Sequence, residues 1–83
     1  MKVNVKYFAS IREALGAGEV VEMPAGGTVG ALRDRLIAAS PAHAEALARG
    51  RALRAALDQA LCDESAVLAD NAEVAFFPPV TGG

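Results

Sequence analysis

The part of the sequence best suited to chemistry is its end, residues 78–83. A double proline holds the chain extended there. Only one apolar side chain, that of Val80, follows it, so little could fix the segment to a core. Because glycine lacks a Cβ atom, a Gly-Gly end can thread a narrow channel in a partner and bring the Gly83 carboxylate against a nucleotide without steric cost. We therefore expect a domain over residues 1–79 and a projecting tail over residues 80–83, with insertion into the partner carried by Pro78, Pro79, Val80, Thr81 and Gly82. Taken alone, a Gly-Gly end is more often a frayed terminus, because the motif is short.

The other side chains that could take part in chemistry are isolated from one another in the sequence. Cys62 is the single cysteine and has apolar neighbours, which is typical of a packing residue, and it cannot form an internal disulfide. His43 has no second histidine or cysteine at ligand spacing and is expected to be solvated. The glycine-rich residues 26–30 lack the lysine of a phosphate-binding loop and predict a turn followed by a helix cap. We predict no metal site and no cofactor or nucleotide site on this chain.

Charge and composition limit the classes of partner. The chain has 83 residues, enough for one small domain, and a formal net charge of -2, which provides no electrostatic footprint for nucleic acid. Its basic residues are scattered except for Arg49, Arg51 and Arg54. This cluster could meet acidic surface on the partner that holds the nucleotide, but such clusters are more often solvated, and we assign it no role.

The pattern of apolar residues indicates a cytoplasmic protein with no membrane segment. No apolar run approaches the roughly 20 residues that a membrane span requires. The first residues alternate apolar and polar side chains, unlike a secretory signal. A single cysteine also fits a reducing compartment.

Periodicity predicts the elements that must hold the tail. Val3, Val5 and Tyr7 alternate with polar neighbours, as in a half-buried strand. Thr28 can cap a helix with Val29, Leu32, Leu36 and Ala39 on its apolar face, and Arg33, Asp34 and Arg35 are expected to face water. The expected order is a strand at 3–8, a connection at 11–18, a strand at 19–23, a turn at 24–27, a helix at 28–39, a weaker helix at 42–49, a strand at 54–62, a short edge strand at 65–68, a turn at 70–72 and a last strand at 73–77.

The alanine-rich stretch at residues 51–62 is the least clear of these elements. Propensity alone favours a helix there. We predict a strand, because a two-strand hairpin with one helix needs more strands to cover it, and because Leu57, Gln59 and Leu61 alternate with their neighbours. The resulting order is ββαββ with an extra helical turn, an α+β fold in which a mixed sheet packs on one main helix.

Three segments of the chain have distinctive sequences. The end is the most specific of them: Val74-Ala75-Phe76-Phe77-Pro78-Pro79-Val80-Thr81-Gly82-Gly83. The other two are Val5-Lys6-Tyr7-Phe8-Ala9 followed by Ile11-Arg12-Glu13, and Thr28-Val29 with Leu32-Arg33. Together they resemble the small, sulfur-carrying subunit of molybdopterin synthase. The chain departs from the family at residues 70–72, where a glycine is usual; Asn71 can adopt the left-handed conformation instead.

The resemblance implies a fold and a reaction cycle. The family is similar to ubiquitin in its β-grasp fold, a mixed sheet that grips one helix. A partner enzyme of the ubiquitin-activating type would use ATP to adenylylate the Gly83 carboxylate, and sulfur would then replace the adenylate to give a thiocarboxylate. The large synthase subunit, expected in a heterotetramer with two copies of each subunit, would receive the tail and use its sulfur to build the molybdopterin dithiolene from a cyclic pterin phosphate. Acid-base groups and nucleotide contacts then belong to the partners, and the isolated chain is not expected to be an enzyme.

Strand alternation also predicts a docking patch for a partner subunit. On the last strand Val74 and Phe76 point one way and Phe77 the other, and Phe8 lies on the polar face of the first strand. Leu61 could join Phe8 and Phe77 in an apolar patch. The alternative is that both aromatic side chains are buried in the core, where large aromatics usually lie.

Two other classes of function stay open at this point. A β-grasp sulfur donor for thiamine or a thiolated nucleoside, or a protein modifier that forms isopeptide bonds, would use the same tail, although the Phe-Phe-Pro-Pro stretch disfavours them. A plain interaction module would use no tail chemistry at all. Appending one residue after Gly83 separates the module from the carriers, because it blocks activation and leaves docking intact.

Overall fold

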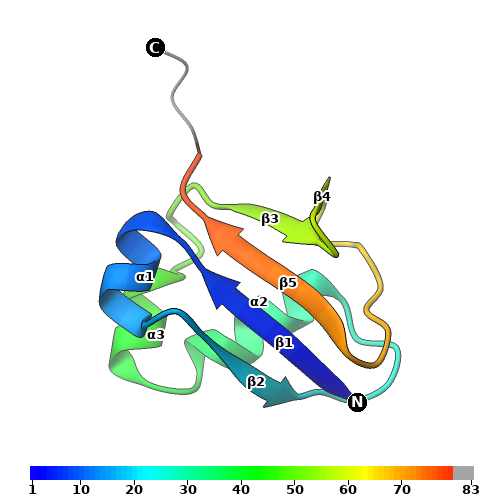
Figure 1. The fold of residues 1–83 in the computed structure, drawn as a ribbon. Coiled ribbons are helices and arrows are strands. Elements are labelled where there is room, and N and C mark those ends of the chain that lie inside the picture. Colours follow the sequence, from blue (N-terminus) through cyan, green and yellow to red (C-terminus); the bar gives the residue numbers. More distant parts are fainter. Residues whose placement is uncertain (80–83) are drawn as a thin grey trace.

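The computed structural model describes residues 1–79, and the predicted tail at residues 80–83 lies outside the described residues. Figure 1 shows the arrangement of the elements. They run in the order β1 (Lys2–Tyr7), α1 (Ala9–Leu15), β2 (Gly18–Glu22), α2 (Val29–Ile37), α3 (Pro41–Ala46), β3 (Arg54–Leu57), β4 (Ala60–Cys62) and β5 (Ala72–Phe77). Within this part of the chain, no helix is both long and apolar enough to cross a membrane.

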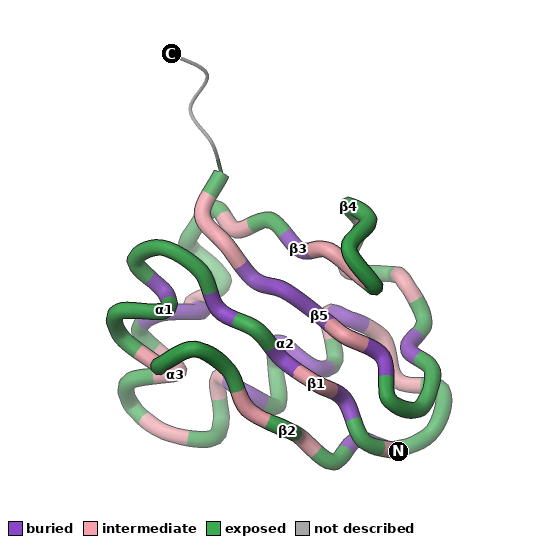
Figure 2. The backbone as a smooth tube through the Cα atoms, in the orientation of Figure 1, coloured by how far each residue is buried: buried purple, intermediate pink, exposed green. Residues whose placement is uncertain are grey.

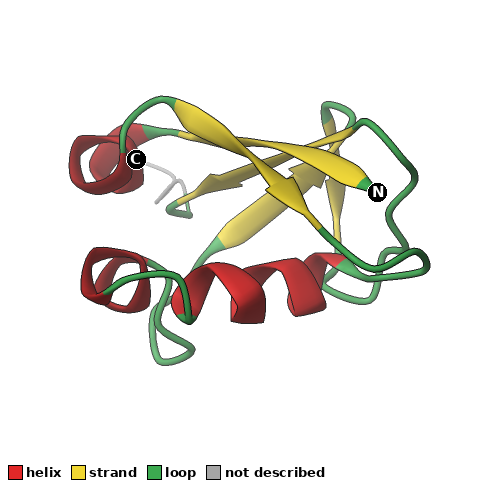
Figure 3. Ribbon diagram, turned by 90° about the horizontal axis from the view of Figure 1, so that it is seen from below, coloured by secondary structure: helices red, strands yellow, loops and turns green. Residues whose placement is uncertain are grey.

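The strands form one mixed sheet in the order β2-β1-β5-β3-β4. The two central strands, β1 and β5, come from opposite ends of the chain and run parallel, with Val5 opposite Val74. The remaining pairs, β1 with β2, β3 with β5 and β3 with β4, are antiparallel. Seen from below, α2 lies across one face of this sheet (Figure 3). The expected mixed sheet on one main helix is confirmed.

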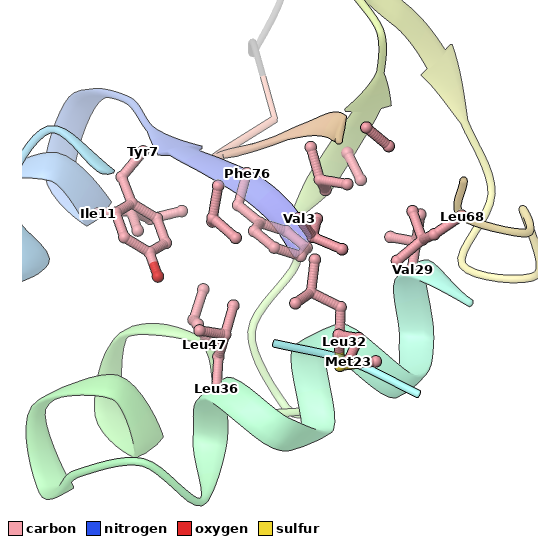
Figure 4. Close-up of a cluster of buried hydrophobic side chains, with 14 of the residues drawn as sticks. Val3, Tyr7, Ile11, Met23, Val29, Leu32, Leu36, Leu47, Leu68 and Phe76 are labelled. Atoms are coloured by element: carbon pink, nitrogen blue, oxygen red, sulfur yellow. The ribbon is translucent and has the colours of Figure 1, made fainter. Parts of the chain in front are cut away.

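The core lies between the sheet and α2 (Figures 2 and 4). Alternate residues of the central strands point into it, and α2 contributes Val29, Leu32 and Leu36 of the predicted stripe. The fourth predicted member, Ala39, is exposed and lies beyond the end of α2. The Thr28 hydroxyl accepts a hydrogen bond from the Ala31 N–H at 3.1 Å, so the predicted cap is confirmed. The largest fully buried side chains are Tyr7, Phe76, Leu32, Leu36, Leu47, Val3, Val29 and Val74.

The connection expected at residues 11–18 is wrong over most of its length, because α1 occupies Ala9–Leu15. The two glycines that suggested a loop come after the helix, and Gly16, with φ 90°, is its C-cap. Ile11 is buried and Leu15 packs against the core, four residues apart on one helical face. The first two strands therefore pair as predicted, but a helix joins them.

The single strand expected at residues 54–62 is also wrong, because β3 and β4 form a hairpin over this stretch. Asp58 and Gln59 occupy its two-residue turn with φ values of 48° and 72°. Two positive φ values in a row define a type I′ turn, whose twist matches that of the flanking strands. The edge strand expected at residues 65–68 is absent from the described structure, where Val67 makes only an isolated bridge to Thr28. Asn71 takes the left-handed conformation, with φ 64°, as predicted.

Replacing Gln59 by glycine is expected to stabilise the domain by about 0.5–1 kcal/mol, because glycine adopts a positive φ without the Cβ strain that glutamine carries. Urea unfolding of the Gln59→Gly variant measures this change. The matched control is Ala60→Gly in the adjoining strand, which should destabilise by about 0.5–1 kcal/mol because no strain is relieved there. Equal effects of the two substitutions would rule out the turn explanation.

The only buried charged side chain among residues 1–79, Arg33 on α2, ties three segments together. Its Nε donates to the Leu47 carbonyl at 2.9 Å, and its Nη2 donates to the carbonyls of Ala48 at 2.6 Å and Arg51 at 3.3 Å. Its Nη1 forms an ion pair with Glu64 at 2.8 Å. A planar guanidinium with five donors satisfies these converging acceptors at once. Arg33 therefore fixes the segments before β3 and after β4 to the main helix.

Candidate functional site

The face of the sheet opposite α2, here called the outer face, carries the side chains predicted for docking. On β1, Val3, Val5 and Tyr7 are buried in the core. Successive side chains of a strand alternate between faces, so Lys6 and Phe8 point outward. Phe8 is 44% exposed. The alternative of a core position for Phe8 is therefore wrong.

The last strand places Phe77 beside Phe8. Val74 and Phe76 are buried on the core side, which puts Ala75 and Phe77 on the outer face. The N–H of Phe8 donates to the Phe76 carbonyl at 3.2 Å, which carries the parallel pairing one residue beyond β1. Phe77 is half-buried. The two aromatic side chains thus lie on neighbouring strands of one face.

Leu61 lies on the same face, but the structural reason differs from the one expected from the sequence. The predicted single strand would have set its direction by alternation from Leu57, but the hairpin turn comes between them. Leu61 instead pairs with Ala56, and Ala56 pairs with Ala75. Directly paired residues share a face, so Leu61 points outward, and it is 64% exposed. We call the set Phe8, Phe77, Ala75, Ala56 and Leu61 the outer-face patch.

The outer-face patch ends where the tail begins. Phe77 is the last residue of β5. Pro78 is half-buried and Pro79 is exposed, and the other predicted tail residues, Val80, Thr81, Gly82 and Gly83, lie outside the described residues. Figure 1 shows that β5 occupies the middle of the sheet, with strands on both sides. A central strand held on both edges is a rigid base from which a tail can be presented.

A chain of hydrogen bonds on the core side holds the end of β1 that carries Phe8. The Tyr7 hydroxyl donates to Glu19 at 2.8 Å, and the same carboxylate oxygen accepts from His43 Nε2 at 2.7 Å. His43 Nδ1 lies 2.7 Å from the Ser40 hydroxyl. Burial and the adjacent Glu19 carboxylate raise the pKa of Tyr7, which keeps the hydroxyl a donor. The expectation of a solvated His43 is therefore wrong, since its ring connects α3 to β1 and β2.

Stability is expected to fall in acid because two carboxyl groups are held in their charged form. Burial favours the neutral form of Glu19, but the hydrogen bonds from His43 and Tyr7 outweigh it and lower the pKa of Glu19. Hydrogen bonding to Arg49 lowers the pKa of Glu64. A carboxyl whose pKa is lower in the folded state stabilises the fold above its unfolded pKa, and this contribution is lost as pH falls through the folded value.

Urea unfolding between about pH 6 and about pH 3 measures this loss. The Glu19→Gln variant should lose less stability than wild type over that interval, because the amide cannot titrate. Glu13→Gln, an exposed change on α1, is the control and should keep the wild-type dependence. A Glu19→Gln variant with the wild-type pH dependence would contradict the assignment.

Cys62 is placed as a packing residue, in agreement with its interpretation from sequence. It pairs with Ala55, whose side chain is buried, so it faces the core side of the hairpin and is half-buried. Burial and the nearby Asp63 raise the pKa of the Cys62 thiol, which disfavours the reactive thiolate. Over residues 1–79, no group of three or more His, Cys, Asp or Glu residues is arranged to hold a metal ion.

Two features of the site escaped sequence reasoning. The hydrogen-bonded chain through Glu19 and His43 joins residues 24 positions apart, and neither residue stands in a motif. The buried position of Arg33 was also missed. It was expected to face water with Asp34 and Arg35, and this is wrong for Arg33, which is 4% exposed. An arginine within the helix-start motif shared with the family was the one available indication.

The fold and the site together define the class of protein: a β-grasp, ubiquitin-like domain whose central strand leads into a Gly-Gly tail. The chain belongs to the ThiS family, whose family model matches residues 5–83. It is 43% identical over 81 residues to the molybdopterin synthase sulfur carrier subunit of Escherichia coli (strain K12). The alignment covers 98% of this chain and 99% of that protein.

Solved structures show the same architecture. The crystal structure of SAMP1, the small archaeal modifier protein 1 of Haloferax volcanii, superposes with a TM-score of 0.81 at 26% identity over 100% of both chains. A protein-protein complex of subunits 1 and 2 of the molybdopterin-converting factor from Helicobacter pylori 26695 contains a chain with a TM-score of 0.70 at 26% identity, again over 100% of both chains.

Proposed function

We propose that this chain is the sulfur carrier subunit of a molybdopterin synthase and works in complex with a large subunit. The observation that carries the proposal is the 43% identity, over nearly the whole of both chains, to a protein of that name. In the Helicobacter pylori complex, the chain that is similar to this one belongs to an assembly of subunits 1 and 2, which supports a large-subunit partner. We expect two copies of each subunit, as in the heterotetramer predicted from sequence.

The working group in this proposal is the Gly83 carboxylate. A carboxylate is a poor electrophile because its charge is shared by two oxygens, so one oxygen must first join a leaving group. In the activating partner, a carboxylate oxygen attacks the α-phosphorus of ATP and pyrophosphate leaves, which gives an acyl adenylate. Hydrosulfide then attacks the carbonyl carbon, the bond from that carbon to the AMP oxygen breaks, AMP leaves, and loss of a proton gives the thiocarboxylate. ATP binds that enzyme, and this chain contributes no cofactor site.

The sulfur is then delivered by insertion of the tail, Pro78, Pro79, Val80, Thr81, Gly82 and Gly83, into the large subunit. There the thiocarboxylate sulfur forms a bond to a carbon of the cyclic pterin phosphate precursor. Water then cleaves the resulting thioester, which leaves the sulfur on the precursor and restores the Gly83 carboxylate, and two such transfers build the dithiolene. The chain is therefore a sulfur-donating subunit of a sulfurtransferase, and the groups that move protons belong to its partners.

The outer-face patch is the proposed docking surface for the large subunit. Phe8, Phe77 and Leu61 present apolar surface at the base of the tail, where a partner that takes up the tail must make contact. Central aromatic residues of an interface are typical hot spots. Their removal should therefore weaken binding much more than it weakens the fold.

Alanine at Phe8 or Phe77 is expected to raise the Kd for the large subunit by about 30-fold or more. Calorimetric titration measures the Kd, and thermal unfolding shows whether each variant is folded. Val67→Ala is the matched control, since Val67 is 64% exposed but lies in the segment that bridges to Thr28 before α2. Folded Phe8→Ala and Phe77→Ala variants that bind as wild type would contradict docking by this face.

The experiment that tests the function is the intact mass of the purified chain after incubation with ATP, a sulfide source and the activating enzyme of the same organism. We expect the mass of the chain to increase by the difference between one sulfur and one oxygen atom, and this increase to be confined to the terminal peptide. The loaded chain, mixed with the large subunit and the pterin precursor, should then return to its original mass as the dithiolene forms. Failure to load with any of several competent activating enzymes would contradict the proposal.

A second candidate is a protein modifier, favoured by the full-length structural similarity to small archaeal modifier protein 1. A modifier would use the same adenylate but transfer the Gly83 carbonyl to a lysine amine, forming an isopeptide bond. Conjugates that carry the Gly-Gly end on lysines of other proteins would support this candidate. A carrier for thiamine or a thiolated nucleoside would instead load with sulfur and fail to act with the large subunit.

A further inference from the structure

An arginine of β3 lies beside the base of the tail. Arg54 is directly opposite Phe77 in the antiparallel pair of β3 and β5. The adjacent pair, Ala55 with Phe76, is buried on the core side, so Arg54 and Phe77 both point to the outer face. Arg54 therefore continues the row that starts with Phe8 and Phe77, at the point where β5 ends.

Three other cations of the domain are paired with carboxylates, whereas Arg54 has no such partner among residues 1–79. Lys6, on the same face, is paired with Glu73 at 3.0 Å. Arg33 and Arg49 are both paired with Glu64. Arg54 is exposed and forms no ion pair with any residue in the range 1–79. Although Asp63 and Glu64 line the same hollow as Arg54, neither carboxylate lies within ion-pair distance of it.

A partner that takes up the tail has to cover this position. Gly83 is six positions beyond Phe77, and an extended chain spans at most about 3.3–3.6 Å per residue, so a partner that encloses the Gly83 carboxylate comes within roughly 20 Å of Phe77. A partner that takes up the whole segment from Pro78 to Gly83, as proposed above, covers the end of β5 as well. Contact with Phe77 then removes water from Arg54, the residue paired with it. Taking a guanidinium out of water is costly unless an opposite charge meets it.

We propose that Arg54 is a specificity-determining contact that pairs with an acidic side chain of the large subunit, at the mouth of the channel that receives the tail. The proposal rests on the function proposed above and adds the chemistry of the partner surface. That surface should be apolar where it meets Phe8 and Phe77 and should carry an aspartate or glutamate beside them. A surface with a lysine or arginine there would be rejected, because like charges in a desolvated contact repel.

Charge reversal tests the pairing. Binding of the large subunit from the same organism is measured by calorimetric titration for wild type, Arg54→Ala and Arg54→Glu, each at low and high salt. The matched control is Arg35→Glu, which makes the same change in net charge at an exposed position of α2, on the opposite side of the sheet. Thermal unfolding establishes that the variants are folded, as expected for exposed positions.

The proposal expects Arg54→Glu to raise the Kd by about 30-fold or more and Arg54→Ala by about 10-fold, with a weaker salt dependence for Arg54→Ala than for wild type. Arg35→Glu should bind within about threefold of wild type. Folded Arg54 variants with the wild-type Kd, or an equal loss in Arg35→Glu, would overturn the inference while leaving the proposed function in place. A wild-type chain that loads no sulfur and binds no large subunit would overturn both.

Discussion

One extra residue after Gly83 is expected to abolish sulfur loading. In a chain extended by one alanine, the Gly83 carboxylate becomes an amide carbonyl, which has no charged oxygen to attack ATP. The new carboxylate is displaced by about 3.5 Å, and it belongs to an alanine, whose Cβ atom glycine lacks. Because a misplacement of about 1 Å can cost about 100-fold in rate, loading should fall by at least that factor.

The measurement is the fraction of chain that gains the oxygen-to-sulfur mass increase in the reconstituted activation reaction. The extended chain should still bind the large subunit through the outer-face patch within about tenfold of wild type, since Phe8, Leu61 and Phe77 are unchanged. Proteolytic removal of the added residue supplies the control and should restore loading. An extended chain that loads at the wild-type rate would show that activation uses another group.

The second large effect is expected at Arg33. Replacement by alanine should destabilise the domain by about 3–5 kcal/mol, because it removes the buried partner of Glu64 and the side-chain hydrogen bonds to the carbonyls of Leu47, Ala48 and Arg51. The buried Leu47 carbonyl then loses its guanidinium donor. Total stabilities of small domains are about 5–15 kcal/mol, so much of the stability would be lost. Arg33→Lys should recover only part of it, since an ammonium cannot match the fork of a guanidinium.

Urea unfolding of Arg33→Ala, Arg33→Lys and Arg35→Ala measures the effect. Arg35 is on the same helix but exposed, so its replacement should change stability by no more than about 0.5 kcal/mol. A loss below about 1 kcal/mol for Arg33→Ala would mean that water replaces the guanidinium at these carbonyls and that Arg33 is not a structural tie.

Short-range patterns were sufficient where one element sets its own geometry. Alternation predicted which side chains of β1 and β5 point into the core, because a strand turns its side chains to opposite faces whatever it pairs with. The apolar stripe and the Thr28 cap predicted α2, since both act within one or two helical turns. The same alternation placed Phe8 and Phe77 outside the core, which proved correct.

Patterns failed where neighbouring signals competed. Glycines that end α1 suggested a loop in place of the helix before them, although Ile11 and Leu15 have helical spacing. Alternation through residues 57–61 suggested one strand, because a type I′ turn built from Asp58 and Gln59 lacks the usual glycine signal. Leu61 was assigned to the outer face correctly, but for a reason that the hairpin overturns.

The sequence by itself determined the chemistry and the faces of individual elements: the Gly-Gly end with its double proline, the main helix, and the outward aromatic residues. Only the tertiary structure decided what these residues stand next to. Pairing of β1 with β5 joins segments about 70 residues apart, and the β3 register brings Arg54 beside Phe77. Arg33 is buried because distant loop carbonyls converge on it. Such contacts depend on which elements share the core, and no local window of sequence contains that information.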